Sequence, residues 1–129
     1  MNFKKIILAK LKSLRLLSKT EFVFLYGSVA RGEATPLSDV DICLSLHLQS
    51  KERLRARIRL LAALPENYDI TIFEDLPLYI QREVFKGKLL YCRNKTKVIE
   101  RALQMIRDYE DFKPIYDYYI ARDKSKVEI

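Results

Sequence analysis

The run from Asp39 to Leu46 constrains the fold most, because polar and apolar side chains alternate along it. Successive side chains of a strand point to opposite faces, so the alternation predicts a strand with one apolar face and one acidic face. We expect the apolar face to meet the core and the carboxylates of Asp39 and Asp41 to project together from the other face. The apolar residues are Val40, Ile42, Leu44 and Leu46.

Helices and short strands alternate along the rest of the chain. The predicted helices are 1–17, 51–64, 78–85 and 96–122, with a helical turn at 28–32 and a loop at 33–37. The predicted strands are 21–26, 39–46, 68–73 and 88–92. This order predicts an α/β (α+β) fold with one domain over 1–129, in which helices flank a mixed central sheet of about four strands.

Two of these helices carry more specific expectations. Pro114 should kink or interrupt the last helix, because proline lacks an N–H and clashes with the preceding turn. Whether the aromatic side chains of that helix form core or interface is left open. In helix 51–64 the expected buried stripe is Leu54, Ile58, Leu61 and Leu64.

The charge balance favours anionic partners. The chain has 24 Lys and Arg against 17 Asp and Glu, a formal charge of +7, which suits nucleotides, nucleic acid or an acidic protein surface without choosing among them. Cys43 and Cys92 lack partners at metal-ligand spacing and are expected to be buried free thiols, which fits a reducing cytoplasm. No apolar run approaches the ~20 residues of a membrane helix, so we expect a cytoplasmic protein.

A phosphate-binding turn is predicted where the first strand ends. Gly27 permits a tight turn and close approach of the backbone to a ligand, and Ser28 opens a helical turn whose free N–H groups suit a phosphate. Asp39 and Asp41 supply the oxygen ligands that Mg²⁺ or Mn²⁺ prefers, with substrate phosphates completing the shell. Either pair alone is common in structural turns and strands, but together they indicate metal-assisted phosphoryl or nucleotidyl transfer.

The stretch from Leu25 to Leu44 resembles the minimal nucleotidyltransferases of the DNA polymerase β-like superfamily. Their pattern is Tyr-Gly-Ser-x-Ala-Arg-Gly-Glu-Ala-x-x-x-Ser-Asp-x-Asp, and this chain carries each of those elements. The resemblance implies the polymerase β-like nucleotidyltransferase fold, ATP as substrate and a third acidic residue on a later strand, for which Asp69 is the candidate. The catalytic and metal-binding residues would be Asp39, Asp41 and Asp69, and the nucleotide-binding residues Gly27, Ser28 and Arg31. Arg31 has an open alternative, an ion pair with Glu33 or with an acidic residue of the site.

The same resemblance implies a protein partner. Minimal nucleotidyltransferases are commonly antitoxins of HEPN-type toxins, and some transfer AMP from ATP to a tyrosine of the toxin. Two alternatives stay open: an antitoxin that acts by binding alone, and a nucleotidyltransferase for a small-molecule hydroxyl such as that of an aminoglycoside. The latter usually carries a further substrate-binding domain, for which this chain has no room. Direct nucleic-acid binding is not expected, and the acceptor, the base preference and the oligomeric state are open.

Overall fold

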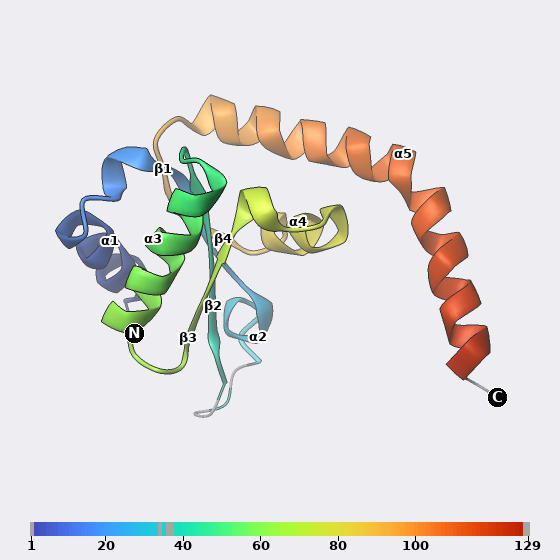
Figure 1. Cartoon of the computed structure of the whole chain (residues 1–129), viewed down its shortest axis with the longest axis horizontal. Helices are drawn as coiled ribbons and strands as arrows, with labels where there is room; N and C mark the ends of the chain where they lie inside the picture. The colour runs from blue at the N-terminus through green and yellow to red at the C-terminus, as the bar shows by residue number, and fades with distance from the viewer. Residues whose placement is uncertain (1, 34, 36–37, 128–129) are drawn as a thin grey trace.

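A four-stranded mixed sheet, in the order β3-β2-β1-β4, forms the centre of the fold. The structure is a computed structural model that describes residues 2–33, 35 and 38–127 (Figure 1). β1 (Thr20–Tyr26) runs antiparallel to both β2 (Val40–Leu46) and β4 (Lys88–Cys92), whereas β2 and β3 (Tyr68–Ile72) are parallel. The predicted mixed sheet and its strands are therefore confirmed to within a residue or two at each end.

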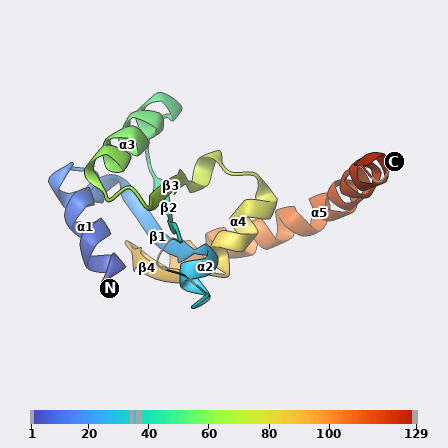
Figure 2. The ribbon, with the colours of Figure 1, turned by 90° about the horizontal axis from the view of Figure 1, so that it is seen from below.

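Helices cover both faces of this sheet (Figures 1 and 2). On one face α1 (Phe3–Ser13) and α3 (Ser50–Ala63) bury Ile7, Leu11 and Leu60 against the aliphatic face of β2. On the other face, α4 (Leu78–Phe85), the 3₁₀ turn η2 (Phe73–Asp75) and the start of α5 (Lys95–Val127) enclose a second core. The buried residues of this second core are Phe22, Phe24, Cys43, Phe73, Val84 and Val98.

The expectation that β2 has one acidic, solvent-exposed face is wrong for most of the strand. Its alternation is as predicted, but Cys43 and Ser45, on the face of Asp41, are 0% and 1% exposed. The aromatic rings of the second core cover that part of the strand. Only the first residues of β2 remain accessible, so the acidic face is confined to one end of the sheet.

The predicted buried stripe of α3 is wrong in part. Leu54 and Ile58 are each 56% exposed, whereas Ala56 and Leu60 are buried. Hydrogen bonds of two arginines accompany this rotation: Arg53 Nη1 donates to the Leu48 carbonyl at 2.9 Å and Arg57 Nε to the Ile70 carbonyl at 2.6 Å. Both guanidinium groups bond to backbone carbonyls, and that of Arg53 also pairs with Asp75 at 2.7 Å. An apolar periodicity does not register such polar contacts.

Helix α5 extends away from the rest of the fold in both ribbon views. Pro114 lies inside it without ending it, and Figure 1 shows the helix bent part-way along, as a proline in a helix interior requires. The interruption did not occur, but the kink did. The side chains of Phe112, Tyr116, Tyr118 and Tyr119 lie outside the described residues, as do residues 34, 36 and 37 of the predicted loop.

Arg101 fastens the start of α5 to the sheet. Its guanidinium donates to Glu21 of β1 at 3.0 Å and to Glu74 of η2 at 2.9 Å. The Glu74 carboxylate also accepts hydrogen bonds from the Ser45 hydroxyl at 2.6 Å and from the Leu46 N–H at 2.9 Å. One cation thus joins three elements that lie far apart in the sequence.

Among the helices described, none combines the length and apolar composition of a membrane span.

Candidate active site

The chain passes directly from β1 into the single helical turn α2 (Gly27–Ala30). Gly27 makes this possible with a φ of +75°, in the left-handed region that glycine favours. A Cβ at this position would also collide with the carboxylate of Asp41. Gly27 therefore has two reasons to be glycine, one in its backbone and one in the acidic side chain that packs on it.

The start of α2 presents backbone donors beside that carboxylate. Within the turn, the Arg31 N–H donates to the Gly27 carbonyl at 3.2 Å and the Glu33 N–H to the Ser28 carbonyl at 3.0 Å. The N–H groups at the beginning of a helix have no intrahelical acceptor, and a phosphate oxygen is a suitable one. The predicted turn is observed, beginning at Gly27 rather than Ser28.

Asp41 and Asp69 lie side by side on the neighbouring strands β2 and β3. They are register partners in the parallel β2–β3 ladder, and Asp41 is also paired with Tyr26 in the β1–β2 ladder. Asp39 immediately precedes β2 and is exposed, whereas Asp41 and Asp69 are partly buried. The fold therefore brings the three predicted acidic residues to one end of the sheet, next to the α2 turn.

At this end of the sheet the neighbouring carboxylates and partial burial disfavour the ionised form of Asp41. Burial raises the pKa of Asp41 above its ordinary value, and the carboxylates of Asp69 and then Asp39 raise it further, whereas Arg31 lowers it. Burial likewise raises the pKa of Tyr26, whose hydroxyl lies 3.3 Å from that of Thr71. A cation bound between the carboxylates would favour their ionised forms.

The donor set fits a divalent cation that arrives with its substrate. Among the described residues, no group of three or more acidic, histidine or cysteine side chains is gathered closely enough to hold an ion unaided. Mg²⁺ is typically held by one or two carboxylates together with substrate phosphates and water. The crowded pair of Asp41 and Asp69, with Asp39 at its rim, supplies ligands of this kind.

Two other residues of the signature have specific contacts. Arg31 Nε donates to Glu33 at 3.1 Å, and both side chains are more than half exposed, so Arg31 makes the alternative ion pair here while remaining near enough to lower the pKa of Asp41. Ser38 fixes the loop before β2: its hydroxyl accepts the Thr35 N–H at 2.8 Å and its own N–H donates to the Thr35 carbonyl at 3.0 Å.

Three further residues support this end of the sheet; Tyr26 is the tyrosine of the signature, and the other two were not predicted. Tyr26 and Thr71 form a hydrogen-bonded pair beside Asp41. At Gly87 a Cβ would collide with the carbonyl of Leu25, so glycine lets the chain pass close behind the end of β1. The contact of Gly87 with β1 depends on tertiary packing, which no local sequence pattern predicts.

Comparison with known families matches residues 9–96 to the model described as polymerase beta, nucleotidyltransferase. The chain belongs to this nucleotidyltransferase family. The matched region contains α2, the three acidic residues and all four strands, and the observed sheet flanked by helices agrees with the polymerase β-like fold expected from the sequence.

Individual relatives extend the comparison. A protein of Methanocaldococcus jannaschii, named provisionally as a protein adenylyltransferase, is 35% identical over 95 residues, which are 74% of each chain. A chain from a toxin–antitoxin structure with AMP-PNP superimposes with a TM-score of 0.77 at 19% identity, covering 95% of this chain and 98% of that one. A chain from the complex of a tri-AMPylated Shewanella oneidensis HEPN toxin with its MNT antitoxin gives 0.65 at 19% identity, covering 92% and 98%. These structural matches establish the fold.

Proposed function

We propose that this nucleotidyltransferase transfers AMP from ATP to a tyrosine of a HEPN-type toxin and thereby acts as its antitoxin. The observation that carries the proposal is the pairing of Asp41 with Asp69 directly beside the Gly27 turn. Nucleotidyl transfer requires N–H groups that bind phosphate and carboxylates that bind metal. The proximity of the Asp41–Asp69 pair to the α2 turn supports these roles for them.

Each residue has a distinct role in this reaction. The first N–H groups of α2 and the Ser28 hydroxyl bind phosphate oxygens of ATP, and Arg31 can turn from Glu33 toward the same phosphates. Asp39, Asp41 and Asp69 would hold Mg²⁺ or Mn²⁺, which neutralises phosphate charge and polarises the reacting phosphorus when bound. Asp69 would accept the proton of the attacking hydroxyl. A bond then forms between the tyrosine oxygen and the α-phosphorus, and pyrophosphate leaves with the electrons of the broken P–O bond.

A protein acceptor is favoured over a small molecule by both surface and relatives. The Methanocaldococcus relative is named for protein adenylylation, and one structural neighbour comes from a complex whose toxin is AMPylated. In this chain Ile99, Leu103 and Ile106 form an exposed apolar stripe on α5, each about half exposed. Spacings of four and three residues place them on one face of the helix, where a protein partner can cover them.

Co-expression with a HEPN-type toxin followed by intact-mass spectrometry tests the proposal. Each transferred AMP adds about 329 Da to the toxin, a covalent change of its charge, and the Asp41→Asn variant should add none. A toxin that is neutralised by the wild-type protein yet unmodified would instead identify an antitoxin that acts by binding alone. The cytoplasm, which supplies ATP and Mg²⁺, is the compartment that this function requires.

A further inference from the structure

Exposed basic side chains surround the end of the sheet opposite the acidic pair. β1 begins at Thr20 and ends beside Gly27, and a seven-residue strand spans roughly 20 Å. Three neighbouring grooves lie around the far end. The exposed cations that line them, the basic belt, are Lys12, Arg15, Lys19, Arg55, Arg59, Arg93 and Lys97.

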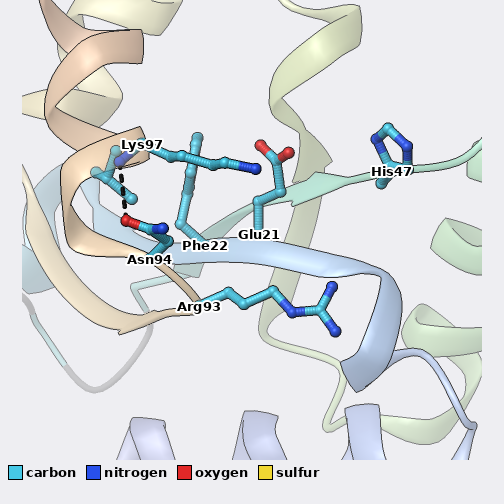
Figure 3. Close-up of a pocket in the computed structure, with 7 residues that line it drawn as sticks. Glu21, Phe22, His47, Arg93, Asn94 and Lys97 are labelled. Carbon is cyan, nitrogen blue, oxygen red and sulfur yellow. Dashed lines mark hydrogen bonds between the residues drawn. The ribbon is translucent and has the colours of Figure 1, made fainter.

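Neighbouring grooves share lining residues. The first has a volume of about 380 Å³ and is lined by His47, Arg93 and Lys97 (Figure 3). Arg93 also lines the second, of about 380 Å³, and Arg15 lines both the second and the third, of about 270 Å³. The short 3₁₀ helix η1 (Leu17–Lys19) contributes Leu17 to the second groove and Lys19 to the third.

The cations of the basic belt outnumber the acidic residues that line the same grooves. Within the described part of the chain, none of the seven forms an ion pair. Two acidic residues line the same grooves, Glu21 and Glu52, and Glu21 is already bound by Arg101 at 3.0 Å. The belt thus carries a strong net positive charge that an anionic ligand would neutralise.

Arg15, which joins two of the grooves, has an unusual backbone. Its φ of 59° is the one positive value described for a residue other than glycine in residues 2–33, 35 and 38–127. The bonds from the Arg15 N–H to the Lys12 carbonyl (3.1 Å) and from the Leu16 N–H to the Leu11 carbonyl (2.8 Å) close α1 in the manner that normally takes glycine there. An arginine is thus present where the backbone favours glycine, which points to a role for its side chain.

We propose that the basic belt binds the phosphodiester backbone of a single-stranded nucleic acid. Four of the seven cations are arginines, whose planar guanidinium suits phosphate. Because the three grooves are lined by separate segments of the chain, a flexible strand can follow them more readily than a stiff duplex. The partly exposed Tyr91 in the second groove offers a ring on which a base can stack. Lysine is depleted in protein–protein interfaces, and the belt holds three. Such binding is the opposite of the expectation drawn from the sequence.

Fluorescence anisotropy with the purified full-length protein tests this binding. The probes are a labelled twelve-nucleotide RNA, a DNA of the same length and, as competitor, polyglutamate of equal charge, each measured across a salt series. Arg93→Gln removes one cation of the basic belt. Lys5→Gln is the matched control, because Lys5 is an exposed cation of α1 that lines none of the three grooves.

We expect the wild type to bind RNA or DNA with an affinity that falls as salt rises, with a slope of roughly 0.7 per phosphate contact. Arg93→Gln should reduce the slope by one contact and the affinity by roughly fivefold at 0.1 M salt, whereas Lys5→Gln should change neither. Asp41→Asn should bind normally, because the nucleotide site lies at the other end of the sheet. A preference for RNA over DNA would identify RNA as the source of the strand.

Arg15→Gly separates binding from folding. Glycine suits the left-handed backbone, so the melting temperature should stay the same or rise while the affinity for the strand falls as in Arg93→Gln. Polyglutamate that competes as strongly as RNA would overturn the proposal, as would equal losses of affinity in Arg93→Gln and Lys5→Gln.

Discussion

Asp41 and Asp69 occupy partner positions in the parallel β2–β3 ladder, so their carboxylates emerge side by side from neighbouring strands. This register, rather than the spacing of either residue in the sequence, gives the site its crowded negative charge. The first two predictions concern the consequences of that crowding for catalysis and for stability.

Replacing either carboxylate by its amide should remove activity while preserving the fold. Asp41→Asn should abolish AMP transfer, and Asp69→Asn should lower its rate by about 10²–10⁴-fold, the usual contribution of a general base. Labelled ATP and thermal melts measure the two effects. Unchanged transfer by Asp41→Asn would rule out the metal-binding role of this pair.

Titration of Asp41 should make the free energy of unfolding depend on pH. Its pKa is raised by folding above 3.8, so the folded state holds this proton more tightly. The free energy of unfolding therefore falls as pH rises from 3.8 to the folded pKa, and stays lower above it. Asp41→Asn has no carboxyl at this position and so does not lose stability in this way. The melting temperature of the variant minus that of the wild type should therefore increase between pH 3.8 and the folded pKa of Asp41, and stay constant above it. Millimolar Mg²⁺ should narrow the advantage at neutral pH, and an advantage that shrinks with rising pH would contradict the assignment.

Gly27→Ala should be far more harmful than Gly32→Ala. Both glycines have a positive φ, +75° and +73°, so each variant incurs a left-handed backbone cost of about 1–2 kcal/mol. At Gly32 no atom lies within 4 Å of an added Cβ, whereas at Gly27 the new atom meets the Asp41 carboxylate. The difference between the free energies of unfolding of the two variants, measured in urea, gives the cost of the contact with Asp41. Equal destabilisation would show that Asp41 yields freely.

Arg101→Met should loosen the attachment of α5. It leaves Glu21 and Glu74 without their shared cation, and both carboxylates are largely buried, with 28% and 22% of the side chain exposed. We expect a loss of about 1–3 kcal/mol, toward the lower end because Arg101 itself is 38% exposed. Lys86→Met is the control, since its pair with Glu83 is about half exposed on both sides. Hydrogen exchange of α5 amides should quicken in the Arg101 variant and stay unchanged in the control.

The apolar stripe of α5 should determine toxin capture. The double variant Leu103→Ala, Ile106→Ala should weaken co-purification of a HEPN-type toxin by tenfold or more, on the order of 1–2 kcal/mol per central apolar contact. Leu54→Ala, Ile58→Ala on α3 is a matched control, because those side chains are equally exposed. Equal loss of capture in both double variants would place the interface elsewhere.

Local patterns predicted local features well. The alternation from Asp39 to Leu46 indicated the strand, and Gly27 followed by Ser28 indicated the turn, because both depend on neighbouring residues. The partnership of Asp41 with Asp69 could be expected from resemblance alone, since a ladder register is set by packing over long distances. The orientation of α3 was missed because Arg53 and Arg57 act through hydrogen bonds rather than hydropathy. The basic belt could not be predicted, because its cations come from several separate segments.

The close approach of Asp41 to Gly27 favours one order in which substitutions can remove such a site. Because a Cβ at position 27 would meet the carboxylate at position 41, a descendant that loses the proposed catalysis can replace Gly27 more easily once Asp41 has been shortened. In the reverse order the Asp41 side chain has to move away from the new Cβ, in addition to the cost of the left-handed backbone. Binding-only descendants of such a protein should therefore include chains that keep the glycine after losing the aspartate, while chains that keep the aspartate without the glycine should be rare.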